Sequence, residues 1–230
     1  MDLSIVVPAY NEEESIPITI GKITELFSNT NIKYELIIVD NGSYDKTLEI
    51  ITSYMKTNKN IRLVTVKKNE GWGNGVLKGC EQAQGKFITY TTADLQTPVI
   101  DILRVYEKIK NETEKIVVKI KRVSRKDGLS RYIFSKFFNS LINILFGFIS
   151  ADINGTPKII QKSIFKNLNL RYKDYFLDAE LIIKYKKNGF KILEIPTNSI
   201  KRKVGKSNVN IIKDSIILFY EILHYRIISK

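Results

Sequence analysis

Polar side chains that could contact a ligand gather at three points of the sequence, each directly after a short apolar run. They are Tyr10, Asn11 and Glu12, then Asp40 to Asp45, and then Asp94 with Gln96. Carboxylate, amide and phenol groups donate or accept hydrogen bonds, so three such clusters together could hold a polar ligand. The same residue types are common in turns and helix caps, which is the simpler interpretation of any one cluster taken alone.

A second group of candidate residues is cationic. Residues 119–136 contain the basic side chains Lys119, Lys121, Arg122, Arg125, Lys126, Arg131 and Lys136 against the single acid Asp127. Residues 201–208, KRKVGKSN, add Arg202, Lys206 and the hydroxyl group of Ser207. Arg and Lys side chains clustered in this way bind phosphate groups and anionic headgroups, although a solvated basic loop has the same composition.

The apolar runs before the three polar clusters predict the elements that position them. Strands are expected at residues 3–7, 35–39, 61–66 and 87–91, and helices at residues 16–27, 48–55 and 76–83. Strands that alternate with helices predict an α/β fold with a mostly parallel central sheet and helices on both faces. Ligands bind such folds outside the carboxyl ends of the strands, so we expect the clusters to face one cleft.

The composition fits one globular domain with anionic partners. The chain has 230 residues, of which 43% are hydrophobic, and this is enough for a sizeable core. Lys and Arg number 37 against 24 Asp and Glu, and the resulting net charge of +13 favours phosphorylated substrates, acidic lipids or nucleic acid. No recognised nucleic-acid signature is present, and a nucleic-acid module would not explain the acidic residues Asp40 and Asp94.

The cysteine content and the N-terminal residues narrow the cellular context. The single cysteine, Cys80, excludes an intrachain disulfide and a cysteine-based zinc site. The first residues lead directly into the first expected strand without a signal-peptide pattern, and no apolar run reaches the roughly 18 to 20 residues of a membrane span. We therefore expect a cytoplasmic protein, and we assign no role to His224, the only histidine.

Seven strings of the sequence, taken in order, resemble the inverting family 2 glycosyltransferases, and most closely their dolichyl-phosphate mannose synthase and polyprenyl-phosphate hexosyltransferase branch. The strings are SIVVPAYNEEESI (4–16), ELIIVDNGSYDKT (35–47), NEGWGNGVLKG (69–79), TADLQTP (92–98), DINGTPKII (152–160), FLDAELIIKYKKNGFKILEIP (176–196) and KRKVGKSN (201–208). The resemblance implies a single nucleotide-diphospho-sugar transferase domain of the GT-A type over residues 1–208. An amphipathic helix over residues 209–230 would then pack on that domain, on a partner or on a membrane surface.

The resemblance also implies which residues bind a nucleotide-sugar donor. Pro8, Tyr10 and Glu12 match the segment that holds the base and ribose, where an aromatic ring stacks and a carboxylate accepts hydrogen bonds. Asp40 matches the carboxylate that reads the base. The family usually has a second Asp at the next position, where this chain has Asn41.

The implied metal position departs from the family pattern. Asp94 and Gln96 match residues that hold Mg²⁺ or Mn²⁺ against the diphosphate, and such hard cations prefer oxygen ligands. Thr92 stands where the family commonly has a further Asp. We therefore expect Mg²⁺ or Mn²⁺ to bind with weakened affinity, unless Lys and Arg side chains supply part of the metal's charge.

The resemblance assigns catalytic roles to two residues. Arg202 matches an arginine that neutralises the leaving diphosphate, with Lys206 and Ser207 beside it, while Asn208 replaces a usual Lys. Asp178 matches an acidic position of the family and is the general-base candidate if the acceptor is a hydroxyl group. With a lipid phosphate as acceptor, Asp178 would instead orient the sugar or the Arg202 loop.

The basic residues 119–136 run directly into an amphipathic apolar stretch, residues 132–149, as in a helix that lies on a membrane. On this hypothesis Arg122 and Arg131 bind the phosphate of a lipid acceptor, and the protein is peripheral on the cytoplasmic face of a membrane. The alternative is that the apolar face packs on the sheet or on a second copy of the chain. Residues 209–228 permit the same two interpretations.

Three other functions compete with transfer to a polyprenyl phosphate, which is dolichyl or undecaprenyl phosphate. The first is transfer to a sugar hydroxyl in glycan or polysaccharide assembly, which would require Asp178 and no lipid. The second is a nucleic-acid-binding module. The third is a protein that binds the donor without turnover, prompted by Thr92, Asn41 and Asn208.

Overall fold

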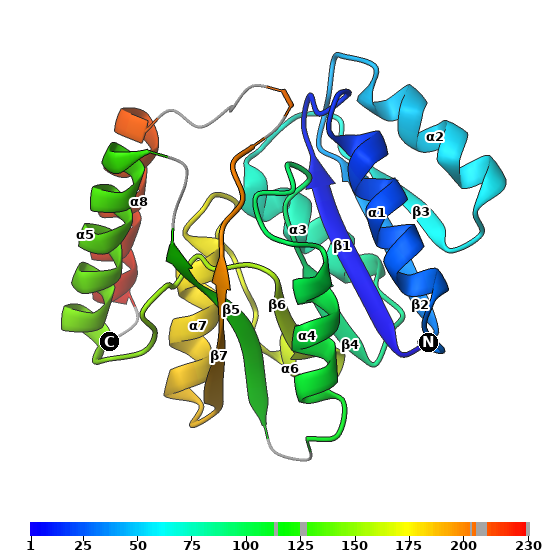
Figure 1. Cartoon of the computed structure of the whole chain (residues 1–230). Helices are drawn as coiled ribbons and strands as arrows, with labels where there is room; N and C mark the ends of the chain where they lie inside the picture. The colour runs from blue at the N-terminus through cyan, green and yellow to red at the C-terminus, as the bar shows by residue number, and fades with distance from the viewer. Residues whose placement is uncertain (113–114, 125–127, 203, 206–210, 229–230) are drawn as a thin grey trace.

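The fold is built on one seven-stranded sheet, which crosses the computed structural model with helices on both faces (Figure 1). The structure describes residues 1–112, 115–124, 128–202, 204–205 and 211–228. The strands are β1 (Leu3–Ala9), β2 (Tyr34–Asp40), β3 (Ile61–Thr65), β4 (Phe87–Tyr90), β5 (Ile116–Ser124), β6 (Lys158–Gln161) and β7 (Lys191–Asn198). They lie in the order β3-β2-β1-β4-β6-β5-β7.

The sheet is parallel except for one strand. β1 pairs in parallel with β2 and β4, β2 with β3, and β5 with β7, whereas β6 runs antiparallel to both of its neighbours. Every residue of β1 and β2 is buried, as expected for strands that helices cover on both faces. The predicted mostly parallel α/β fold is therefore confirmed.

Helices flank the sheet on both faces. They are α1 (Ile16–Ser28), α2 (Thr47–Thr57), α3 (Trp72–Gln82), α4 (Ile100–Ile109), α5 (Leu129–Phe146), α6 (Lys162–Asn167), α7 (Leu177–Lys187) and α8 (Ile211–Ile228). The side chains of α1, α2 and α4 pack on one face of the sheet, and those of α3, α6 and α7 pack on the other face. α5 and α8 lie side by side at one end of the molecule (Figure 1).

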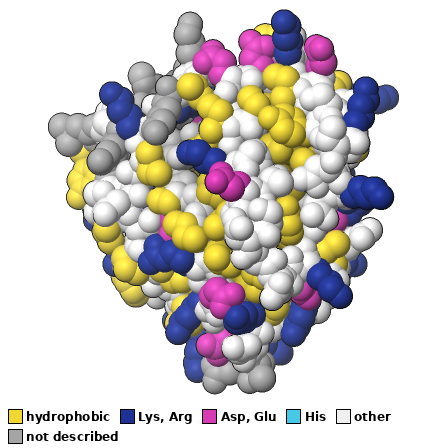
Figure 2. Space-filling view, turned by 45° about the vertical axis from the view of Figure 1, so that its right-hand side comes forward, with side chains coloured by type: hydrophobic (Ala, Val, Ile, Leu, Met, Phe, Trp, Pro, Cys, Tyr) yellow, Lys and Arg dark blue, Asp and Glu magenta, His cyan; other side chains and the backbone are white. Residues whose placement is uncertain are grey.

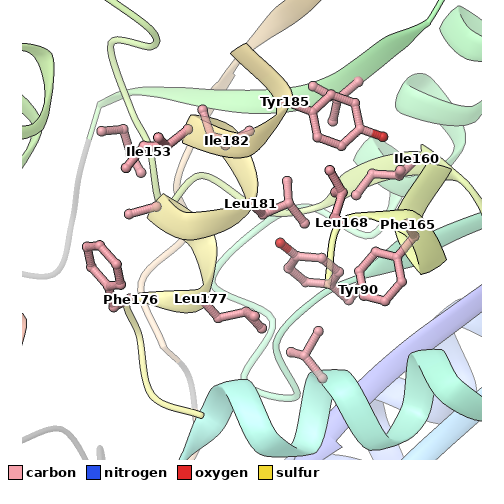
Figure 3. Packing of buried hydrophobic residues seen from close by; sticks show 14 of the residues in the cluster. Tyr90, Ile153, Ile160, Phe165, Leu168, Phe176, Leu177, Leu181, Ile182 and Tyr185 are labelled. Atoms are coloured by element: carbon pink, nitrogen blue, oxygen red, sulfur yellow. The ribbon is translucent and has the colours of Figure 1, made fainter. Parts of the chain in front are cut away.

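Two apolar cores result, one on each face of the sheet. The core under α1 and α4 contains Ile20, Ile23 and Val105, all buried in one cluster with residues of the sheet. The other core contains Phe176 and Leu181 around α7 (Figure 3). This core extends to side chains of α5 and α8. Because α5 and α8 share a core with α7, they belong to the packed domain and are not detached appendages.

Two helices differ in extent from the predictions. α3 begins at Trp72, four residues before the predicted start. The prediction started too late because the first turn has the sequence WGNG, whose glycines have low helix propensity. α5 ends at Phe146 instead of residue 149, because Gly147 adopts a φ of +80° and stops the helix. Among the helices of the described residues, none is long and apolar enough to cross a membrane.

Candidate active site

A cavity of about 560 Å³ opens where β1, β2 and β4 end, at the edge of the sheet where ligands bind in α/β folds. α5 and α8 form the wall opposite these strand ends, and the start of α7 contributes Asp178. Nine of the predicted site residues line this one cavity. They are Pro8, Tyr10, Glu12, Asp94, Gln96, Arg122, Arg131, Asp178 and Arg202.

Asp40, the predicted base-reading residue, does not line the cavity. Its side chain is buried at the end of β2, where the carboxylate accepts a hydrogen bond from the backbone N–H of Ser43 at 3.2 Å. The residue that faces the cavity from this loop is Asn41. Lys206 and Ser207, the other predicted phosphate-binding residues, lie outside the described residues.

Arg202 joins two carboxylates from different loops. Its guanidinium group donates to Glu12 Oε2 at 2.6 Å, and a second nitrogen lies 3.8 Å from Asp94 Oδ2. Residues separated by 190 positions in the sequence are therefore in direct contact at the cavity. An arginine beside two carboxylates gives this part of the site a cation that can pair with an anionic ligand.

Burial raises the pKa of Glu12, although the hydrogen bond from Ser15 and the charge of Arg202 oppose this shift. Moving Arg202 from Glu12 to a ligand would remove part of that opposition. The protonation of Glu12 is therefore coupled to the position of Arg202.

Asp94 lies in a tight turn with Thr92 and Gln96. The Thr92 hydroxyl donates to Asp94 Oδ1 at 2.7 Å, and the backbone N–H of Gln96 donates to the same oxygen at 3.1 Å. The side chains of Asp94 and Gln96 both line the cavity, so their oxygens fit a hard divalent cation together with phosphate oxygens. Among the described residues, no group of three or more His, Cys, Asp or Glu side chains could hold a metal by itself.

Asn41 has a fixed orientation that leaves one atom without a partner. Its Nδ2 donates to Asn69 Oδ1 at 3.2 Å and to the carbonyl oxygen of Gly71 at 2.9 Å. Because both partners are acceptors, the amide cannot be flipped, and the buried Oδ1 has no hydrogen-bond partner within the protein. Asn41 Oδ1 is therefore a buried acceptor beside the cavity whose hydrogen-bonding capacity is not used within the protein.

Arg122 faces the cavity in a bidentate ion pair. Its Nε and one terminal nitrogen donate to the two carboxylate oxygens of Asp152 at 2.8 and 2.7 Å. Burial alone would raise the pKa of Asp152, but Arg122 and Lys119 hold it well below its usual range. The Asp152 loop continues to Asn154 and Thr156, which also line the cavity.

The burial of Lys119 shows that residues 119–136 are not one exposed basic segment. Its side chain is fully buried, and it donates to the carbonyl oxygens of Asp152 and Ile120 and contacts Glu194 at 3.4 Å. Burial lowers the pKa of Lys119 to about 8, while Asp152 and Glu194 oppose the shift. Residues 119–124 of this segment form the end of β5, where only Lys119 and Ile120 are buried, and the residues from Leu129 on belong to α5.

Asp178 lies in the first turn of α7 and lines the cavity. Its Oδ1 accepts hydrogen bonds from the Tyr90 hydroxyl at 2.7 Å and from the ammonium group of Lys158 at 2.5 Å. The sequence analysis did not identify either donor. Their positions become apparent only when the cross-strand pairing of Tyr90 with Lys158 is known.

The sequence analysis also missed an aromatic pair on the cavity wall. Trp72 and Tyr175 stack with ring centroids 6.1 Å apart and an interplanar angle of 18°. Trp72 also packs edge-on against Tyr90 at 5.7 Å. Trp72 is the only tryptophan and stands in the glycine-rich string NEGWGNG, which is the signal that could have identified it.

α5 and α8 supply the remaining wall of the cavity. Arg131, Phe134, Ser135 and Phe138 come from α5, and Asp214 and Leu218 come from α8. The same two helices expose apolar side chains to solvent, and we call this surface the α5–α8 face. It comprises Tyr132, Ile133, Phe137 and Ile144 of α5 and Ile216, Phe219, Tyr220, Leu223 and Ile227 of α8.

Basic side chains are scattered over the surface drawn in Figure 2 and do not gather into one patch there. Apolar side chains are exposed between them. On this side of the molecule, the high net charge therefore does not form a continuous basic surface.

Comparisons with known proteins agree on one family. The sequence model described as Glycosyl transferase family 2 matches residues 4–168. Among curated proteins, two undecaprenyl-phosphate 4-deoxy-4-formamido-L-arabinose transferases are similar to this chain. The protein of Photorhabdus laumondii is 29% identical and that of Pectobacterium atrosepticum is 30% identical, and each alignment covers 96% of this chain. The chain spans 66% of the length of these relatives.

Solved structures show the same fold at low sequence identity. Glucosyl-3-phosphoglycerate synthase from Mycobacterium tuberculosis, in complex with Mn²⁺, UDP-glucose and phosphoglyceric acid, has a TM-score of 0.75 and 18% identity. The match covers 98% of this chain and 79% of that one. The UDP complex of the same synthase has a TM-score of 0.72 and 16% identity.

The orientation of Asn41 generates a prediction for the substitution Asn41→Asp. The carboxylate would replace two donated hydrogen bonds by contacts with the acceptor oxygens of Asn69 and Gly71, so we expect a loss of about 1–3 kcal/mol in the free energy of unfolding. Urea denaturation measures this change. Asn58→Asp is the control, because Asn58 Oδ1 only accepts a hydrogen bond, from Asn60 N–H, and we expect a change within about 0.5 kcal/mol. Unchanged stability of Asn41→Asp would contradict the assigned orientation.

Proposed function

The chain belongs to glycosyl transferase family 2, and from this premise we propose that it transfers a hexose from a UDP- or GDP-sugar to a polyprenyl phosphate. The names of the curated relatives, which are undecaprenyl-phosphate sugar transferases, support this acceptor class. The cavity supports it as well, because a volume of about 560 Å³ is in the range of small-molecule sites.

Donor binding is assigned to the loops that follow β1, β2 and β4. Pro8, Tyr10 and Glu12 bind the base and ribose, with Asn41 Oδ1 accepting a hydrogen bond from the donor. Asp40 supports this loop through its bond to Ser43 and does not contact the nucleotide. Arg202 leaves Glu12 and Asp94 to bind the diphosphate, with which a guanidinium group can form two parallel charge-assisted hydrogen bonds.

The observation that carries the acceptor assignment is the double exposure of α5. One side of this helix presents Arg131 and Phe134 to the cavity. The adjoining side presents Ile133 and Phe137 to solvent, 58% and 57% exposed. A lipid phosphate needs a cation for its headgroup directly beside an apolar surface for its chain, and α5 offers both within about two turns.

The proposed reaction is one displacement with inversion. An oxygen of the acceptor phosphate attacks the anomeric carbon, while the bond from that carbon to the diphosphate breaks and its electron pair leaves with the nucleoside diphosphate. The phosphate oxygen is already ionised at neutral pH, so the step needs alignment more than proton removal. Arg202 stabilises the charge that develops on the leaving diphosphate, and Arg131 holds the acceptor.

A divalent metal, Mg²⁺ or Mn²⁺, is proposed at Asp94 and Gln96. Such an ion supplies charge neutralisation at the diphosphate. This chain contributes one carboxylate and one amide oxygen, while the Thr92 hydroxyl is engaged with Asp94 Oδ1. The neighbouring Arg202 contributes a further positive charge, so metal affinity is expected to be low without the donor.

The α5–α8 face is proposed to rest on the cytoplasmic surface of a membrane. Ile144, Ile216 and Ile227 are 79%, 66% and 73% exposed, which is unusual for isoleucines on two adjacent helices. The mouth of the cavity beside Arg131 then lies close to the headgroups, where a polyprenyl phosphate is found.

The reaction is tested by nucleotide release from purified protein with a panel of UDP- and GDP-sugars. We expect release that requires both a short polyprenyl phosphate and Mn²⁺ or Mg²⁺, and that EDTA abolishes.

The substitution Arg131→Ala should raise the KM for the lipid phosphate by about tenfold or more, since it removes a charge-assisted hydrogen bond to phosphate. Release without lipid in the presence of a sugar hydroxyl would favour the hydroxyl-acceptor function. Donor binding without release under any condition would favour a protein without turnover.

The metal site is tested by the substitution Thr92→Asp. A second carboxylate beside Asp94 increases the charge of the site, so we expect Mn²⁺ to bind at least about tenfold more tightly, as measured by electron paramagnetic resonance in the presence of UDP. Thr52→Asp is the control, since it adds the same charge on the exposed surface of α2. Equal Mn²⁺ affinity of the two variants would argue against metal binding at Asp94.

The membrane placement is tested by co-sedimentation with vesicles that contain anionic lipid. Replacing Ile133 and Phe137 with Glu should weaken binding by about tenfold or more, because two apolar side chains no longer enter the acyl boundary. Met55→Glu, on α2, should bind vesicles like the unaltered protein. If vesicles do not bind and the protein elutes as a dimer in gel filtration, the α5–α8 face is instead an interface between two copies.

A further inference from the structure

Lys158 is a fully buried cation whose counter-charge is Asp178. The ammonium group lies 2.5 Å from Asp178 Oδ1, and the relative exposure of the two side chains is 0% and 4%. Lys158 also lies over the ring of Tyr90 at 5.6 Å from its centroid. Both Lys158 and Tyr90 therefore act on a carboxylate that lines the cavity.

The topology of the sheet produces this arrangement. Tyr90 and Lys158 are directly opposite each other in the antiparallel pair β4 and β6, and both side chains reach Asp178 at the start of α7. Figure 3 shows Tyr90 packed among apolar residues of α6 and α7. Two donors fixed by the sheet thus converge on one oxygen of a helix residue.

Among the described residues, no second cation is available to Asp178. The titratable groups that face the pair from the packed elements are Tyr90 of β4, Cys80 of α3, Tyr185 of α7, Lys119 and Arg122 of β5, and Asp152 of the loop between α5 and β6. Burial raises the pKa of Cys80, Tyr90 and Tyr185, so all three are neutral at physiological pH. Arg122 and Lys119 are engaged by Asp152.

We propose that Lys158 is a positioning residue that keeps Asp178 ionised throughout turnover, so that Asp178 is a fixed hydrogen-bond acceptor and not a proton acceptor. If Asp178 took a proton, the ammonium group of Lys158 would be left buried without a counter-charge, and such a state is strongly disfavoured. Within the described residues, Tyr90 and Lys158 both donate to Oδ1 of this carboxylate, which leaves Oδ2 for a hydroxyl group of the sugar.

This inference rests on the proposed function and refines its acceptor. A hydroxyl acceptor must lose a proton as it attacks, and the ion pair with Lys158 makes Asp178 unsuited to receive it. A phosphate acceptor brings an ionised oxygen and needs no base. Lys158 therefore favours phosphate over hydroxyl acceptors without contacting either.

The first test needs no substrate. In protein labelled with ¹³C at the aspartate carboxyl carbon, the Asp178 resonance is assigned by its absence from Asp178→Asn. We expect it to show no titration between about pH 5 and pH 9 in the unaltered protein, and to titrate within this range in Lys158→Met, because a buried carboxyl group without a cation prefers its neutral form. Lys158→Arg and Tyr90→Phe, which keep the cation, should behave like the unaltered protein. The same titration in Lys158→Met as in the unaltered protein would overturn the proposal.

The second test uses turnover and covers the case in which Lys158→Met fails to fold. The double variant Lys158→Met, Asp178→Asn removes both charges, so neither is left buried alone. An amide oxygen still accepts a hydrogen bond from the sugar, but more weakly than a carboxylate does, so we expect kcat for transfer to polyprenyl phosphate to fall by about tenfold. A loss of about a thousandfold with donor affinity intact is the size expected for removal of a general base and would overturn the proposal.

The two tests separate this inference from the proposed function. If the unaltered protein transfers no sugar to polyprenyl phosphate, the proposed function fails, while the carboxyl titration still decides the state of Asp178. If Asp178 titrates near neutral pH in the unaltered protein that does transfer sugar, only the inference about Lys158 fails.

Discussion

Charges buried inside a protein must be paired, and the second half of this sheet, which consists of β6, β5 and β7, depends on that constraint. Lys119 of β5 is compensated by Asp152 and Glu194, and Lys158 of β6 by Asp178. Arg122 completes the set by binding both oxygens of Asp152. Two side chains that line the cavity, those of Arg122 and Asp178, are members of these pairs, so pairing the buried charges also fixes their positions in the site.

The first half of the fold follows closely from the sequence. Runs of apolar residues that end in polar clusters predicted β1, β2 and β4, and the parallel order of these strands brings Glu12, Asn41 and Asp94 to one edge. Which polar residue after a strand points into the cleft was less predictable. Asp40 and Asn41 are adjacent, and only the turn that Asp40 forms with Ser43 shows that Asn41 is the one facing the cavity.

The second half could not be read in the same way, because its contacts depend on strand direction and on distant pairings. β6 runs antiparallel to β4 and so places Lys158 opposite Tyr90. No local sequence pattern predicts that β6 runs in this direction. Lys119 belongs to a basic run in the sequence, yet it lies in the part of β5, residues 116–120, where every side chain is buried, while Arg122 lies beyond this part and faces the cavity. Charge density along a sequence therefore does not show which charges are exposed when the segment is a strand.

α8 comes after every other element that lines the cavity, and it contributes Asp214 and Leu218 to the wall and Ile222 and Tyr225 to the core. A ribosome delivers the domain in chain order, so a nascent chain has all seven strands before it has a closed site. Until α8 is released, the core beneath α5 and α7 remains open to solvent. A chain interrupted before α8 thus carries an exposed apolar surface of the kind that chaperones and proteases recognise, and it lacks one wall of the cavity.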